Sequence, residues 1–95
     1  GGGIPANLAR ILSTDCDAVV DRSRWEEPRI FGEIQRAGDV ADGEMEHVFN
    51  LGIGMVAVVA PGDAHRSLDA VRATGHDAWS VGTIADGHGE VHISR

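Results

Sequence analysis

The sequence feature that most constrains the fold is the apolar run from Met55 to Ala60, which the dipeptide Pro61-Gly62 ends. The run is too short to cross a bilayer, and its Val-rich composition is typical of a strand buried on both faces. Asn50, Gly52 and Gly54 stand just before it. Glycine lacks a Cβ and so permits close approach of another group. This Gly-x-Gly is therefore either a tight packing point or the wall of a ligand site, and packing is the commoner role.

Hydrophobic periodicity predicts a single α+β domain around this strand. We expect helices over residues 5–12, 28–38 and 63–75. A further helix would begin at residue 39 or 42 and end at residue 47 or 48. We expect strands over residues 18–20, 55–60, 78–85 and 90–94. The two strands that flank the last helix would form a βαβ unit. The turn at residues 86–89 would return the chain as a C-terminal hairpin. The prediction is a mixed β-sheet of about four strands with three to four helices packed on it.

Charge and residue usage exclude several classes of function. The formal net charge of −7 argues against nonspecific nucleic-acid binding, which needs clustered cations. The chain has no Lys, which excludes a Schiff base, a phosphate-binding lysine and a lysine general base. The single Cys16 cannot form an intramolecular disulfide or a multi-cysteine zinc site. The sequence shows neither a signal peptide nor a membrane-spanning run, so we expect a cytoplasmic protein with no membrane partner.

Two further patterns have both a chemical and a plainer interpretation. The glycine run at residues 1–3 precedes a helix that begins near Pro5, an arrangement suited to anions, but such a run also fits a flexible leader. His88, Glu90 and His92 alternate, so on a strand they would share one face and could hold a metal ion. A solvent-exposed strand face is the favoured interpretation, because nothing else is predicted to organise ligands there. We therefore predict no catalytic residue and no metal ligand.

Four segments in order resemble one enzyme family. They are Gly1–Leu8, Ala18–Trp25, Phe49–Met55 and Val81–Ile84. Together they are similar to the C-terminal domain of phosphoribosylformylglycinamidine cyclo-ligase, also called aminoimidazole ribonucleotide synthetase, over almost the whole chain. The third segment is the most specific. At Glu46-His47-Val48 the chain departs from the Tyr-Arg-Thr usual in the family, which weakens the case for an anion contact from that helix face.

The resemblance implies an ATP-dependent ligase of purine biosynthesis that uses Mg²⁺. Members of the family close formylglycinamidine ribonucleotide into aminoimidazole ribonucleotide. They phosphorylate the formyl amide oxygen, and the amidine nitrogen then displaces phosphate. An N-terminal domain of the family supplies most of the ATP-binding residues and forms a homodimer. The resemblance thus implies that residues 1–95 are an incomplete C-terminal domain, without the N-terminal ATP-binding domain, and that alone they are inactive.

The resemblance also assigns site residues. The predicted substrate- or phosphate-binding residues are Gly1, Gly2, Gly3, Asn50, Gly52 and Gly54. The first three match a glycine loop beside the cleft between domains and would bind through backbone N–H groups, and the other three would line that cleft. Two alternatives stay open. One is a related synthetase or kinase with the same two-domain plan, such as formylglycinamidine synthase, selenophosphate synthetase or thiamine-phosphate kinase. The other is a noncatalytic binding or dimerisation module.

Overall fold

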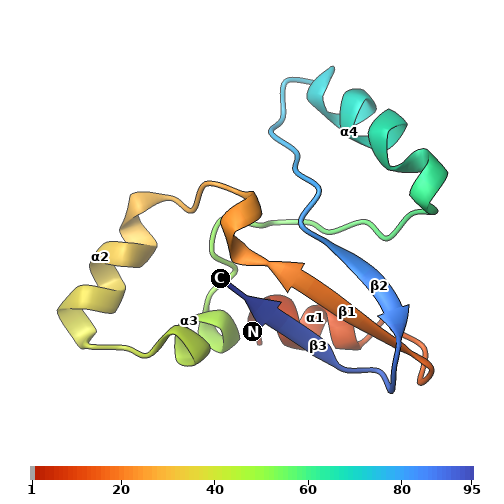
Figure 1. The fold of residues 1–95 in the computed structure, drawn as a ribbon. Helices are drawn as coiled ribbons and strands as arrows, with labels where there is room; N and C mark the ends of the chain where they lie inside the picture. Colours follow the sequence, from red (N-terminus) through yellow and green to blue (C-terminus); the bar gives the residue numbers. More distant parts are fainter. Residues whose placement is uncertain (1) are drawn as a thin grey trace.

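The computed structural model describes residues 2–95 (Figure 1), so the prediction for Gly1 lies outside the described residues. Within this range the elements are α1 (Gly3–Ala9), β1 (Cys16–Asp21), η1 (Arg22–Arg24), α2 (Arg29–Gly38), α3 (Asp42–Val48), η2 (Pro61–Asp63), α4 (Ala64–Arg72), β2 (Gly82–Asp86) and β3 (Val91–Ser94). The predicted α+β class is confirmed. The helices α2, α3 and α4 lie close to their predicted ranges, because hydrophobic periodicity is a local signal.

The strands form a mixed sheet of the order β2-β1-β3 in the described part of the chain. β1 is the central strand. It runs antiparallel to β2 and parallel to β3, with Val20 opposite Gly82 on one side and Ile93 on the other. Because strand side chains alternate between faces, Ala18 and Val20 point to one face of the sheet and are almost completely buried, whereas Val19 points to the other.

The predicted strand at residues 55–60 is not part of the sheet. The segment is extended, but no strand among residues 2–95 pairs with it, and Met55 is 89% exposed. Apolar composition predicts that a segment is extended, but it does not say which strand edge the segment reaches. The predicted βαβ unit is therefore wrong, and the sheet of the described chain has three strands rather than about four.

The predicted C-terminal hairpin is also wrong. β2 and β3 follow each other in the chain, yet β1 lies between them and pairs with both. The loop 87–90 crosses the start of β1, where Gly87 N donates to Asp15 O and Gly89 N donates to Cys16 O, both at 2.8 Å. Turn residues correctly predict the reversal of the chain, but they carry no information about a distant strand that fills the space between its arms.

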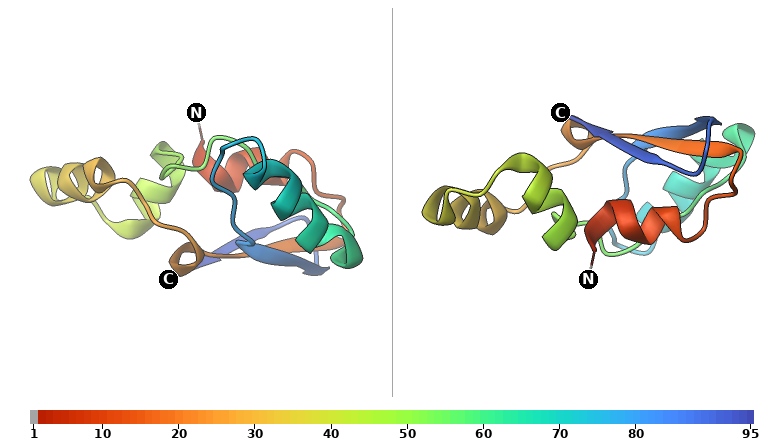
Figure 2. Two further views of the ribbon diagram at one scale, coloured as in Figure 1. Left: turned by 90° about the horizontal axis from the view of Figure 1, so that it is seen from above. Right: turned by 90° about the horizontal axis from the view of Figure 1, so that it is seen from below.

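One face of the sheet packs on α1, and the opposite face carries no helix (Figure 2). The buried core consists of Ile4, Leu8, Ala18, Val20, Trp25, Met45 and Leu51. These residues come from α1, β1, α3 and the segments beside them. On the uncovered face, Val19 is 42% exposed. The core therefore lies between α1 and the sheet and extends toward α3.

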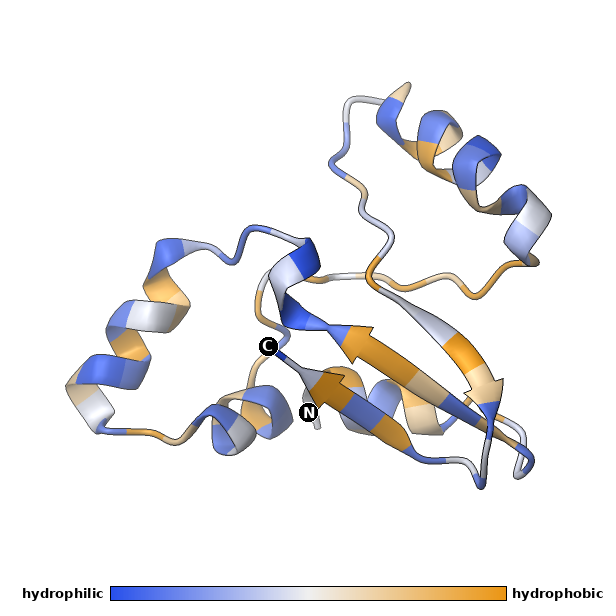
Figure 3. Ribbon diagram, viewed as in Figure 1, coloured by the Kyte–Doolittle hydropathy of each residue, from blue (hydrophilic) through white to orange (hydrophobic). Residues whose placement is uncertain are grey.

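Several apolar faces outside this core are uncovered. Apolar and polar residues alternate along the helices α2 and α4 (Figure 3), and neither helix contains a buried residue. Ile30 of α2 is 54% exposed and Val71 of α4 is 45% exposed. Phe31 of α2 packs against the core, but the remaining apolar side chains of α2 and the apolar face of α4 have little cover among the described residues, which points to a missing contact. Among the described residues, no helix has the length and apolar character to span a membrane.

Candidate functional site

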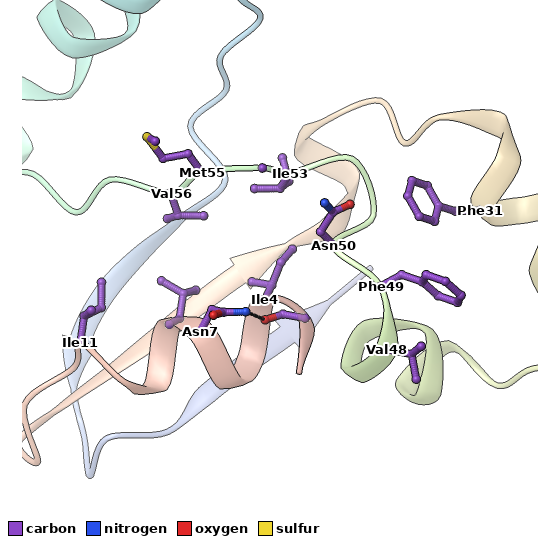
Figure 4. Close-up of a pocket in the computed structure, with 13 residues that line it drawn as sticks. Ile4, Asn7, Ile11, Phe31, Val48, Phe49, Asn50, Ile53, Met55 and Val56 are labelled. Carbon is purple, nitrogen blue, oxygen red and sulfur yellow. Dashed lines mark hydrogen bonds between the residues drawn. The ribbon is translucent and has the colours of Figure 1, made fainter. Parts of the chain in front are cut away.

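A cavity of about 690 Å³ lies between α1, the end of α3 and the segment 49–56 (Figure 4). This volume is in the range of small-molecule sites. The residues that line it are Gly3, Ile4, Asn7, Leu8, Ile11, Phe31, Val48, Phe49, Asn50, Ile53, Gly54, Met55 and Val56. Of the predicted site residues, the cavity brings together Gly3, Asn50 and Gly54. Gly2 and Gly52 lie outside its lining.

A tight turn at Asn50–Ile53 shapes one wall of the cavity. Leu51 and Gly52 have φ angles of 56° and 94°, and Ile53 N donates to Asn50 O at 3.0 Å, as in a type I′ turn. The Asn50 side chain supports the turn, because its Oδ1 accepts from Gly52 N at 2.9 Å. A positive φ is costly for Leu, but the Leu51 side chain is fully buried and its carbonyl accepts the Trp25 indole N–H at 3.1 Å. Burial and this bond hold the turn in place.

The two glycines after Asn50 have different roles. A Cβ on Gly52 would lie 2.5 Å from Pro28 Cδ, so this glycine is required by close packing as well as by its positive φ. A Cβ on Gly54 would meet nothing within 4 Å. Packing therefore explains Gly52, whereas Gly54 leaves open space beside the cavity.

The glycines at the start of α1 are likewise fixed by backbone geometry. Gly2 has a φ of 92° and Gly3 a φ of 62°. A Cβ on Gly3 would collide with the carbonyl oxygen of Glu46 at the end of α3. The absence of a side chain at Gly3 thus lets α1 and α3 meet at the edge of the cavity.

The polar groups of the cavity are few. Asn7 Nδ2 donates to Gly3 O at 2.7 Å, and its Oδ1 accepts from Arg10 Nη1 at 3.2 Å. Within residues 2–95 the Asn50 Nδ2 has no hydrogen-bond acceptor, so it is a donor that the cavity offers to a ligand. The lining residues carry no ionisable side chain in the described chain. The cavity can therefore bind through apolar contact and hydrogen bonds, but its side chains cannot transfer protons.

A second polar cluster lies on the uncovered face of the sheet. Asp17 Oδ1 accepts from the backbone N–H groups of His88 at 2.7 Å and Glu90 at 2.9 Å, and Asp17 Oδ2 lies 2.9 Å from His92 Nε2. These bonds, that from His88 foremost, hold the pKa of Asp17 far below its ordinary value of 3.8. The alternating pattern predicts His88 beside Glu90 and His92. In the structure the side chain of Asp17, not that of His88, lies beside His92, and His88 contributes only its backbone N–H.

A buried charge cluster holds α3 in place. Arg22 Nε and Nη2 both donate to Glu27 Oε1, at 3.1 Å and 2.6 Å. Arg22 Nη1 donates to Glu46 Oε2 at 2.9 Å. Burial alone would lower the pKa of Arg22, but the hydrogen bonds and charges of the two glutamates outweigh it and raise the pKa above its ordinary value. The ion pairs link η1 to α3, whose end forms part of the cavity wall.

Comparison with known proteins decides the family. Residues 1–94 match the family model described as AIR synthase related protein, C-terminal domain. The chain belongs to this family. It is 49% identical over 90 residues to the phosphoribosylformylglycinamidine cyclo-ligase of Anaeromyxobacter sp. (strain Fw109-5), which covers 95% of the chain and 26% of the relative. The same-named protein of Cupriavidus taiwanensis is 44% identical over 86 residues, or 90% of the chain and 25% of the relative. The chain thus spans about a quarter of the length of these relatives.

The sequence patterns did not predict two residues at the polar sites of this AIR synthase related domain. Asn7 lines the cavity, and its spacing of four residues from Gly3, which places both on one helix face, could have indicated this. Asp17 holds the 87–90 loop from a different strand. No local pattern could have indicated that role, because it depends on the pairing of β1 with β3.

Proposed function

We propose that this domain is part of an ATP-dependent cyclo-ligase that converts formylglycinamidine ribonucleotide into aminoimidazole ribonucleotide in purine biosynthesis. In this proposal the cavity is one wall of the substrate cleft. The observation that carries it is that the start of α1 and the segment 49–56, far apart in the sequence, contribute Gly3, Asn50 and Gly54 to one cavity. The curated relatives named as cyclo-ligases support the reaction type.

The proposed roles follow from the chemistry of each group. Gly1, Gly2 and Gly3 would present backbone N–H groups to substrate or phosphate. Asn50 would donate from Nδ2, while Gly52 shapes the wall and Gly54 leaves room for the ligand. These groups would bind and orient the substrate. In the proposed reaction the formyl amide oxygen would attack the terminal phosphorus of ATP and ADP would leave. The amidine nitrogen would then attack the formyl carbon, lose a proton to solvent and displace phosphate. Such a reaction depends mainly on positioning and charge stabilisation.

The described cavity lining offers no carboxylate ligand for Mg²⁺. Mg²⁺ in proteins is held by carboxylates together with substrate phosphates, and the lining described above has no carboxylate. ATP with Mg²⁺ would supply the phosphoryl group and neutralise its charge. We propose that residues beyond this chain hold both, so that residues 1–95 alone are inactive.

We further propose that residues 1–95 are an incomplete C-terminal domain of a two-domain synthetase, which acts as a homodimer in the cytoplasm. The apolar faces of α2 and α4 support this proposal, because further chain would bury them. Ile34 of α2 is 36% exposed and Val58 of the segment before α4 is 50% exposed. The greater length of the cyclo-ligase relatives agrees with it.

The test uses the full-length protein that contains this chain, with formylglycinamidine ribonucleotide, ATP and Mg²⁺ as reactants. Gly54→Leu places a side chain in the open space beside the cavity, so we expect kcat/KM to fall at least about tenfold through loss of positioning. A Cβ on Gly43 of α3 would also meet nothing within 4 Å, and Gly43 lies outside the lining. Gly43→Leu is therefore the matched control and should retain activity.

The two parts of the proposal fail in different ways. A full-length wild-type protein that forms no aminoimidazole ribonucleotide would overturn the function. An active protein in which Gly54→Leu works as well as Gly43→Leu would leave the function in place and overturn the role of the cavity.

A further inference from the structure

We propose that Asp17, Glu90 and His92 form a binding site for a divalent transition-metal ion, Zn²⁺ being the best match. One donor atom from each side chain lies within 4.8 Å of the other two. His92 Nε2 is 2.9 Å from Asp17 Oδ2 and 3.7 Å from Glu90 Oε2. The three donors come from two neighbouring strands and the end of the loop that joins β2 to β3. This site is independent of the proposed function.

The spacing of the donors fits a single ion. Two ligands that each lie about 2.1 Å from Zn²⁺ in tetrahedral geometry are about 3.4 Å apart. The distances from His92 Nε2 to Asp17 and to Glu90 lie on either side of that value. Small rotations of the half-exposed side chains of His92 and Glu90 would equalise them. Ordinary side-chain freedom therefore suffices to close the site around an ion.

The fold organises these ligands in advance. The parallel register places Ala18 opposite Val91 and Val19 opposite His92, so Asp17 and His92 project from the same face of the sheet. The two backbone N–H groups that bond to Asp17 Oδ1 hold this carboxylate in one orientation. Oδ2 is left facing His92, so the most buried of the three ligands is also the one held most firmly.

Charge and donor type point to zinc rather than magnesium. Asp17 and Glu90 bring two negative charges together, and within residues 2–95 neither carboxylate forms an ion pair with an arginine. A cation between them would neutralise this charge, with neutral His92 supplying its Nε2 lone pair in place of the hydrogen bond to Asp17. Imidazole nitrogen suits Zn²⁺, whereas Mg²⁺ prefers an all-oxygen shell.

Open space beside the three ligands leaves room for another. The side chains of His92 and Glu90 are 55% and 66% exposed, so the site on the uncovered face is open to solvent. Three protein ligands with a free position are typical of zinc sites that bind water or a small molecule. The ion would therefore keep an exchangeable position toward solvent.

Isothermal titration calorimetry with ZnCl₂ on the metal-free protein tests the proposal. The variants are His92→Ala and Glu90→Gln. The matched control is His65→Ala, because His65 Nε2 also lies 3.3 Å from a carboxylate, that of Asp69, but no third ligand is grouped with that pair in the described chain. We expect one Zn²⁺ per chain and at least a tenfold loss of affinity in each of the first two variants, with no change in the control.

Further measurements settle the folding and the choice of metal. Circular dichroism of the metal-free variants checks that they fold, and His92→Gln replaces the alanine variant if that one unfolds. Millimolar Mg²⁺ should not displace Zn²⁺. The absence of saturable Zn²⁺ binding would overturn the proposal, as would displacement of Zn²⁺ by Mg²⁺. An isotherm that either site variant leaves unchanged, or an equal loss of Zn²⁺ affinity in the control variant, would overturn it as well.

Discussion

Replacing Glu46 by Gln should destabilise the protein when Arg22 is present but not when Arg22 is replaced by Met. The Arg22 residue is 3% exposed, and its Nη1 lies 2.9 Å from Glu46 Oε2. Glu46→Gln keeps the shape of the side chain but turns a charge-assisted hydrogen bond into a neutral one. A charge-assisted hydrogen bond contributes about 1.5–3 kcal/mol to stability, and a neutral one contributes about 0.5–1.5 kcal/mol. We therefore expect the free energy of unfolding to fall by about 1 kcal/mol.

Arg22→Met should cost more, because it leaves Glu27 and Glu46 without the cation between them. Removing one partner of a buried ion pair costs about 3–5 kcal/mol. Both glutamate side chains are 17% exposed, and Arg95 remains 3.4 Å from Glu27, so we expect the lower end of that range. In this background Glu46→Gln removes a repelling charge, and its effect should be neutral or stabilising.

Urea unfolding of the four proteins of this double-mutant cycle measures the coupling. A Trp79→Phe background leaves the buried Trp25 as the fluorescent reporter. We expect a coupling energy of about 1–2 kcal/mol, as for residues in one ion-pair network. If Glu46→Gln had the same effect with and without Arg22, the ion pair would not hold α3 in place.

A surface pair provides the control for this cycle. Arg29 and Glu33 of α2 lie 3.3 Å apart with side chains 93% and 49% exposed. Exposed helix pairs contribute about 0.3–0.5 kcal/mol. Glu33→Gln should therefore change stability by less than Glu46→Gln does, and it should be insensitive to Arg22.

Three further results are expected. Gly52→Ala should lower stability by more than about 1 kcal/mol, because Gly52 has a positive φ and lies against Pro28. Gly54→Ala should change stability by less than about 0.5 kcal/mol. Equal shifts of the two variants in thermal unfolding would contradict this. Because the folded state lowers the pKa of Asp17, its contribution is complete above its ordinary pKa of 3.8 and is lost as the pH falls below it. Asp17→Asn should therefore lower Tm at pH 7, and the difference from wild type should shrink in acid rather than stay constant. Calorimetry of residues 1–95 with ATP and Mg²⁺ should show no tight binding, and a micromolar Kd would refute the assignment of these ligands to chain outside this range.

The helices could be predicted because hydrophobic periodicity is a local pattern. The strand order of the sheet could not be predicted, because its strands pair over long distances in the sequence. The spacing of Ile30 and Ile34 predicts α2 from a few neighbouring residues. The pairing of Val20 with Gly82 and Ile93 depends on residues that no local pattern connects. The same limit explains the two wrong predictions, the βαβ unit and the hairpin. Both assumed that neighbours in the sequence pair with each other.

The candidate site was predictable in part. The Gly-x-Gly motif is compatible with close packing and with ligand contact, and the structure shows close packing at only one of its two glycines. Gly52 packs against Pro28, whereas Gly54 borders the cavity. Sequence spacing alone could not separate these roles, because the difference lies in what another segment places beside each glycine.

The position of β1 between β2 and β3 has a consequence for the order of folding. The bond from Glu90 N to Asp17 spans 73 positions, so the sheet cannot close until nearly all of the chain described here is available. Loop closure over such distances slows folding. While the ribosome is still adding residues 22–81, β1 has two unpaired edges and an apolar face, the kind of surface that chaperones bind and that mispairs with other chains. Synthesis that stops before Val91 would leave this strand with one neighbour and its second edge open.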